Sequence, residues 1–213
     1  MSPRLVPVVD AFASAYRGDV CSLHGLDAVP TVLPVETWTA EADPGDRAVL
    51  AHCRGATLDI GCGPGRMAEL LAARGQVVLG IDVVPEAVAQ TRDRGVAAVV
   101  RDVFDPMPGE GRWETALLAD GNLGIGGDPA ALLRRVHELL APGGRVVADL
   151  APPGTGLREL SVRLESDRVR TLPFPWAVVG VDAITAVVDG AGFEVSLVDR
   201  YAGRWFTVLE RTS

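Results

Sequence analysis

The sequence contains no lysine, and its 20 cationic side chains, all arginine, are set against 28 aspartates and glutamates. The formal net charge is −8 at pH 7. Affinity for nucleic acid comes largely from cationic patches that displace counterions from the phosphates. The excess of acidic side chains therefore disfavours binding to a phosphate backbone. No nucleic acid is therefore expected as a partner.

Cysteine is also scarce. Cys21, Cys53 and Cys62 are odd in number and form no C-x-x-C pair. This pattern indicates neither a disulfide scaffold nor a zinc cluster, and no metal is expected. A reducing compartment fits best, and we expect a cytoplasmic protein.

Long apolar runs are missing as well. No run approaches the roughly 18 residues that a membrane helix needs. The first apolar stretch, Leu5 to Val9, is interrupted by Pro7 and followed by Asp10, so it is too short for the core of a signal peptide. We expect no membrane association.

The chain does contain a regular alternation of short β-branched runs and longer amphipathic ones from Thr57 onward. This alternation is typical of βαβ units around a parallel sheet, and it predicts a single α/β domain. The expected strands are 57–60, 77–81, 97–100, 115–119, 145–150, 194–199 and 205–210. The expected helices are 66–74, 85–94, 129–140 and 182–191, with Pro85 and Pro129 in first turns and glycines just past several ends.

Two segments do not follow the alternation. Residues 1–55 precede the first expected strand, and we interpret them as an N-terminal helical cap. Residues 56–213 form the α/β domain, with a substrate-side insert at about 151–178 that carries a proline and glycine cluster. Ligands of open α/β sheets bind beyond the carboxyl ends of the strands, so both segments are candidates to cover the site. The alternative is that they only pack as helices and loops.

The most informative segment runs from Asp59 to Arg66, with glycines at alternate positions, 61, 63 and 65. It closes an expected strand and opens an expected helix, and glycines there let a ligand approach the main chain closely. A dinucleotide fingerprint needs its third glycine three residues after the second, where this chain has Arg66. Asp82 ends the next expected strand, where a carboxylate can accept hydrogen bonds from both hydroxyls of a ribose.

The pattern Asp59-x-Gly61-x-Gly63-x-Gly65 resembles the class I S-adenosylmethionine-dependent methyltransferases. The resemblance continues through 101–105 and through the helix end and turn at 139–145. It implies a Rossmann-like, doubly wound sheet of seven strands in the order 3-2-1-4-5-7-6, mostly parallel with an antiparallel last strand. It also implies S-adenosylmethionine as cofactor and S-adenosylhomocysteine as product.

The resemblance assigns cofactor-binding roles to eight residues. The methionine moiety would contact Gly61 and Gly63, and Asp59 would favour its ammonium group. Asp82 would hold the ribose. Val83 and Val103 would flank the adenine, Asp102 would accept a hydrogen bond from the adenine amine, and Ala119 would contact the cofactor. Alternatively, Asp59 only caps the turn and Asp102 only begins one.

Candidate catalytic residues come from two places. In the implied topology, the loop that begins at Asp120 borders the methyl group and the acceptor. Methyl transfer is an in-line displacement that needs a general base only when the nucleophile must lose a proton. Asp120 is the leading candidate, and His24 would reach over the site from the N-terminal segment. The alternative for Asp120 and Asn122 is a turn whose side chains bind their own backbone.

Four aromatic residues outside the glycine loop, Tyr16, Trp38, Phe174 and Trp176, either line an apolar pocket or simply pack. Taken together, these features predict a methyltransferase that acts on a small organic acceptor, as a monomer or homodimer. Three other classes remain open: a non-catalytic S-adenosylmethionine-binding regulatory protein, a protein or nucleic-acid methyltransferase, and an NAD-dependent oxidoreductase.

Overall fold

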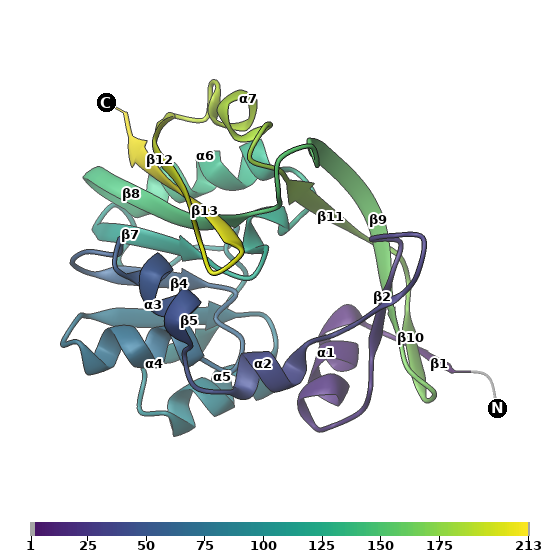
Figure 1. Cartoon of the computed structure of the whole chain (residues 1–213). Coiled ribbons are helices and arrows are strands. Elements are labelled where there is room, and N and C mark those ends of the chain that lie inside the picture. Colours follow the sequence, from purple (N-terminus) through teal and green to yellow (C-terminus); the bar gives the residue numbers. More distant parts are fainter. Residues whose placement is uncertain (1–2, 213) are drawn as a thin grey trace.

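Buried β-branched runs form a seven-stranded sheet in the computed structural model, which describes residues 3–212 (Figure 1). The sheet has the order β12-β13-β8-β7-β4-β5-β6. Neighbours from β6 to β8 pair in parallel, whereas β13 is antiparallel to both β8 and β12. The expected order 3-2-1-4-5-7-6, with an antiparallel last strand, is confirmed. The strands are β4 (Thr57–Ile60), β5 (Val78–Asp82), β6 (Ala98–Val100), β7 (Trp113–Leu118), β8 (Leu140–Leu150), β12 (Phe193–Tyr201) and β13 (Arg204–Arg211).

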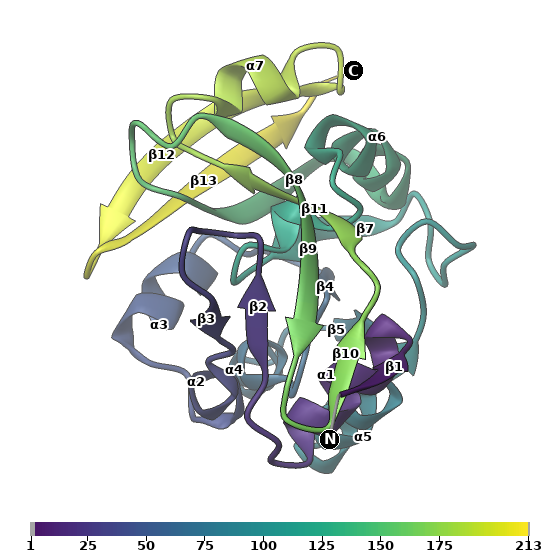
Figure 2. The same cartoon turned by 90° about the vertical axis from the view of Figure 1, so that its right-hand side faces the viewer.

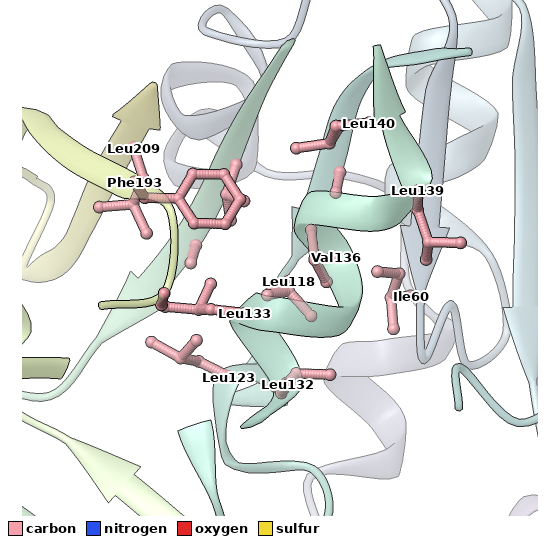
Figure 3. Packing of buried hydrophobic residues seen from close by; sticks show 14 of the residues in the cluster. Ile60, Leu118, Leu123, Leu132, Leu133, Val136, Leu139, Leu140, Phe193 and Leu209 are labelled. Atoms are coloured by element: carbon pink, nitrogen blue, oxygen red, sulfur yellow. The ribbon is translucent and has the colours of Figure 1, made fainter. Parts of the chain in front are cut away.

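Helices cover both faces of this sheet because its buried strands have apolar side chains on both faces. On β7, Ala116 and Leu118 join the core on the side of α6 (Pro129–Leu139) and α7 (Ile184–Val188). Figure 3 shows Leu118 in this core beside the leucines of α6. Leu117 alternates to the opposite face, in a cluster with residues of α3 (Pro44–Leu50) and α4 (Arg66–Ala73). The remaining helix of this unit, α5, spans Pro85–Asp93.

The segment 139–145 is expected to be a helix end and a turn. Leu139 does end α6, but residues 140–145 are already part of β8 in the structure. The pairing of β7 with β8 shifts register between Trp113 and Thr115, which lie opposite Leu140 and Arg145. The intervening residues of β8 therefore bulge, and Gly143 takes a positive φ of 73° there. The turn-like composition marks a bulge within the strand.

A second sheet brings together the two segments that do not follow the alternation. Its order is β1-β10-β9-β2-β3, and β11 also pairs with β9 (Figure 2). The N-terminal segment supplies β1 (Arg4–Val6), β2 (Ser22–His24) and β3 (Thr31–Val32); the insert supplies β9 (Leu157–Glu165), β10 (Val169–Thr171) and β11 (Phe174–Val179). The N-terminal segment is therefore not purely helical, although it also contains α1 (Val8–Tyr16), α2 (Val35–Thr39) and α3. The sequence does not indicate these strands because β1 pairs with β10, more than 160 residues further along the chain.

Helix α1 joins this second sheet to the rest of the molecule. On one side, Ala11 packs in a cluster with Val6 of β1 and Leu164 of β9. On another side, Ala13 packs against Val84 and Ala87, at the start of α5. Figure 1 shows α1 between α5 and the second sheet. The N-terminal segment is thus anchored beside the strand edge that holds the glycine loop.

No helix among residues 3–212 is long and apolar enough to cross a membrane.

Candidate active site

The glycine loop connects β4 to α4 in a conformation that only glycine adopts easily. Gly61, Gly63 and Gly65 have φ values of 70°, 54° and 88°. The amides of Gly61 and Cys62 both donate to the Ile81 carbonyl, at 2.8 and 2.9 Å, and so tie the loop to β5. A Cβ on Gly65 would lie 2.6 Å from the hydroxyl of Thr91. The loop is therefore both tightly turned and tightly packed.

Asp82 lies at the end of β5, directly beside this loop. Its Oδ2 accepts a hydrogen bond of 3.0 Å from the Gly63 amide, and its Oδ1 accepts one of 2.9 Å from the Val84 amide. Burial raises the pKa of Asp82 against the opposing effect of these bonds. Each carboxylate oxygen retains a lone pair, so the geometry leaves room for the predicted ribose contacts.

Asp59 is the most unusual group of the site. The residue is 1% exposed, and neither carboxylate oxygen has a hydrogen-bond partner among the described residues. Burial raises its pKa to about 7, and the nearby charge of Asp120 adds to the shift. A buried carboxylate without a partner is energetically costly. A cationic ligand group at this point would supply the missing hydrogen bonds and the opposite charge. An ammonium group such as that of a methionine moiety fits that requirement.

The residues expected around an adenine lie at the ends of β5 and β6. Val83 is 41% exposed, whereas Val103 is buried in the core. Asp102 is exposed, and its Oδ1 accepts a 3.0 Å hydrogen bond from the Phe104 amide, which is the turn geometry of the alternative interpretation. The ring of Phe104, which sequence reasoning did not single out, is also exposed. Its place in the sequence, two residues after Asp102, does not by itself indicate a role in the site.

Tyr16 extends from α1 to the glycine loop. Its hydroxyl lies 3.5 Å from the point where a Cβ on Gly63 would stand. Burial raises the pKa of Tyr16, and the charge of Asp82 raises it further. The ring also contacts Trp38 of α2, with centroids 6.3 Å apart. The N-terminal segment thus reaches the loop through an aromatic residue that was expected to line a pocket or to pack.

Asp120 follows β7, and its carboxylate is held by two arginines. Arg66 Nη1 and Nη2 donate to its two oxygens at 2.6 and 3.0 Å, and Arg204 Nη2 donates at 3.2 Å. Because the carboxylate is already engaged in a bidentate, charge-assisted contact with Arg66, the geometry favours a structural role for Asp120 over the expected role of a general base. Ala119, the preceding residue, is buried and accepts from the Asn122 amide.

The arginines around Asp120 extend the ion pairs into a larger network. Asp46 of α3 accepts from Arg66 Nε and Nη2 at 3.0 Å each and also from Arg204. Arg204 also donates from Nε and Nη2 to the two carboxylate oxygens of Asp149 of β8, so its Nη2 is shared between Asp149 and Asp120. Burial raises the pKa of Asp149 despite this pairing. At Asp46 burial is the largest single effect and raises the pKa, but the hydrogen bonds from Arg66 and from the Asp43 amide, together with the charges of the two arginines, lower it overall. Sequence reasoning missed this network, because the partners are far apart in the chain.

His24 lies apart from these groups. It pairs in register with Arg163 of β9, while the neighbouring Leu23 pairs with Leu164, which packs toward α1. Successive side chains of a strand alternate faces, so His24 is on the face of the second sheet that points away from α1. Its Nδ1 is 3.5 Å from Arg163 Nη2. This position does not support the expected role of a base over the site.

The insert reaches the loop after β7 through β11. Ile125 forms an isolated antiparallel bridge with Trp176. Gly124 and Gly127 allow the close contact: a Cβ on Gly124 would lie 1.9 Å from the Ala177 carbonyl oxygen, and one on Gly127 would lie 2.7 Å from Pro175. The insert is thus packed against the segment expected to border the acceptor.

The sheet order and the alternating glycine loop are of the methyltransferase type, and comparison with known proteins agrees. Residues 57–144 match the family model described as a methyltransferase domain. Ubiquinone biosynthesis O-methyltransferase from Pseudomonas aeruginosa PAO1 is 39% identical over 110 residues, which cover 47% of this chain and 45% of that protein. An uncharacterized protein from Mycobacterium tuberculosis is 38% identical over 103 residues, 48% of this chain and 34% of its own. The chain thus spans less than half the length of these curated relatives.

Solved structures extend the similarity of fold to nearly the whole chain. A SAM-dependent methyltransferase from Bacteroides fragilis, in complex with S-adenosyl-L-homocysteine, has a TM-score of 0.81 at 23% identity, covering 97% of this chain and 95% of that one. The 1,6-didemethyltoxoflavin-N1-methyltransferase of Burkholderia thailandensis has a TM-score of 0.68 at 21% identity, covering 100% and 93%. Residues 57–144 therefore belong to a methyltransferase domain family, which confirms the resemblance over this segment, and the solved structures show the same fold over nearly the whole chain.

Proposed function

We propose that this protein transfers a methyl group from S-adenosylmethionine to a small organic acceptor and releases S-adenosylhomocysteine. The observation that carries the proposal is the buried, unpartnered carboxylate of Asp59 beside the alternating glycine loop, within the segment that matches the methyltransferase domain. When bound, the cofactor supplies an electrophilic methyl group on a sulfonium. The protein then has to hold the cofactor and align the acceptor.

Eight residues would hold the cofactor. Gly61 and Gly63 let its methionine moiety approach the main chain, and Asp59 pairs with the ammonium group. Asp82 accepts from the ribose hydroxyls while its two backbone hydrogen bonds keep it oriented. The exposed Val83 offers apolar surface to the adenine, with Asp102, Val103 and Ala119 completing the set.

A small acceptor is supported by three separate observations. The net charge of −8 opposes binding of nucleic acid. The second sheet and α1 add chain beside the strand edge that carries the glycine loop, and β11 packs on the loop after β7. A curated relative is named for ubiquinone biosynthesis, and one similar structure contains the heterocycle 1,6-didemethyltoxoflavin. Small aromatic or heterocyclic nucleophiles are therefore the first class to test.

The test is transfer of a labelled methyl group. The purified protein is incubated with methyl-labelled S-adenosylmethionine and, in parallel, with small phenols, aromatic amines and heterocycles, with bulk protein and with total RNA. The proposal predicts label in a small-molecule product, and loss of that label in Asp82→Ala. Label in protein or RNA would contradict the small acceptor. Cofactor binding without transfer to any of these pools would favour the regulatory alternative.

A further inference from the structure

The loop that follows β7 is joined to several neighbouring segments of the site. Its second residue, Asp120, contacts arginines from α4 and β13, and Asn122 contacts the glycine loop. We propose that Asp120 is a positioning residue: held by Arg66 and Arg204, it keeps the loop after β7 fixed onto the glycine loop through Asn122. This inference rests on the proposed function, because the glycine loop is taken to be the cofactor's seat.

The backbone of Asp120 is the first reason. Its φ of 54° is in the left-handed region, which is uncommon for a residue with a side chain and is kept where the surroundings hold it. Three anchors impose it here. The Asp120 amide donates to Asp149 Oδ2, and the carboxylate accepts from Arg66 and from Arg204. The conformation is thus held from β8, α4 and β13 together.

The second reason is what this conformation places two residues later. Asn122 Nδ2 donates to the carbonyl oxygens of Ile60 and Gly61, at 2.9 Å each. A Cβ on Gly61 would lie 2.7 Å from the same nitrogen, so the carboxamide fills the space that a glycine leaves free. The Asn122 side chain is thus engaged with the backbone of the glycine loop and not with that of its own turn.

The third reason is the reach of the network. Arg66 begins α4 immediately after Gly65, and its guanidinium joins Asp120 to Asp46. Both side chains of the Arg66–Asp46 pair are buried, at 6% and 3% exposed. Three carboxylates share two guanidiniums, so removal of an arginine would leave buried negative charge unpaired. Aspartate-to-asparagine substitutions are therefore the gentler probes.

The experiment measures binding of S-adenosylhomocysteine by calorimetry in wild type, Asp120→Asn, Asn122→Ala and the double variant. Asparagine tolerates the left-handed backbone, so Asp120→Asn tests the ion pairs rather than the main chain. Each single variant is expected to weaken binding by about threefold to thirtyfold. The double variant is expected to be no weaker than the weaker-binding single variant, because both act through one path. Asp128→Asn, in the same loop and outside the network, should bind as wild type.

Additive effects of the two substitutions, or wild-type affinity in Asp120→Asn, would overturn the positioning role. A purely structural role would lower thermal stability without this non-additivity in binding. Should Asp120→Asn fail to fold, Asp46→Asn replaces it in the cycle, since Asp46 reaches Asp120 only through the two arginines. Failure of wild-type protein to bind S-adenosylhomocysteine would instead overturn the proposed function itself.

Discussion

The backbone amide of Gly63 donates a hydrogen bond of 3.0 Å to Oδ2 of Asp82. Gly63 belongs to the loop after β4, and Asp82 ends β5, so this contact joins the first two βα units at the edge where the strands end. Ligands of open α/β sheets bind at that edge. The carboxylate thus orients the glycine loop and, in the proposed function, the ribose of the cofactor.

The first prediction concerns this carboxylate. Asp82→Ala should weaken binding of S-adenosylhomocysteine by about tenfold to 150-fold, because a charge-assisted hydrogen bond contributes about 1.5 to 3 kcal/mol. Calorimetric titration measures the change. Asp93→Ala, an exposed aspartate at the end of α5, is the matched control and should bind as wild type. Equal affinity of Asp82→Ala and the control would remove Asp82 from the site.

A second prediction follows from the buried carboxyl of Asp59, whose pKa is raised to about 7. Between pH 4 and 7 the folded protein retains a proton that the unfolded chain releases, so the free energy of unfolding should fall by about 1.4 kcal/mol per pH unit from this group. Asp59→Asn removes this contribution. Urea unfolding from pH 4.5 to 7.5 should therefore show the variant gaining stability relative to wild type as the pH rises. Parallel curves for the two proteins would contradict the raised pKa.

The same group predicts a pH dependence of cofactor binding. If the ionised Asp59 pairs with an ammonium group, affinity for S-adenosylhomocysteine should rise between pH 6 and 7.5. The ionised fraction of a group titrating near 7 grows about eightfold over that interval. Asp59→Asn should bind more weakly at pH 7.5 and show a flat profile. A rise of equal size in the variant would assign the pH dependence to another group.

The contact between β11 and the loop after β7 yields a prediction on stability. Gly124→Ala would place its Cβ 1.9 Å from the Ala177 carbonyl oxygen, so the backbone has to move. We expect a loss of about 3 kcal/mol, the upper range for overpacking. Gly154→Ala is the comparison, because that glycine has a φ of 88° but open space around it, and it should cost about 1 to 2 kcal/mol. Thermal unfolding measures the stability of both variants. Equal losses of stability would show that β11 can shift at little cost to accommodate the added methyl group.

Much of the seven-stranded sheet could be predicted because its signals are local. The buried run at Thr57–Ile60 and the first-turn prolines Pro85 and Pro129 mark elements that the structure has at those positions. The glycine loop and Asp82 were also readable, since their spacing follows from the turn and the strand that hold them. The strand order came from the family resemblance and not from periodicity.

The second sheet could not be predicted in the same way. Arg4–Val6 pairs with Val169–Thr171, and nothing within either short segment encodes the other. Pro175 lies in β11, which pairs with β9 and otherwise forms only the bridge from Trp176 to Ile125 among the described residues, and proline is tolerated on such an edge strand. The ion pairs of Asp120 were hidden for a related reason. Arg204 lies 84 residues away, so only the fold brings its charge to the loop after β7.

The most direct test of the central claim is calorimetric titration of the wild-type protein with S-adenosylmethionine, S-adenosylhomocysteine and NAD. The alternating glycines, Asp59 and Asp82 predict that the sulfonium cofactor and its product both bind and that NAD does not. Binding of NAD, or of none of the three, would contradict the assignment of the glycine loop and the methyltransferase function built on it.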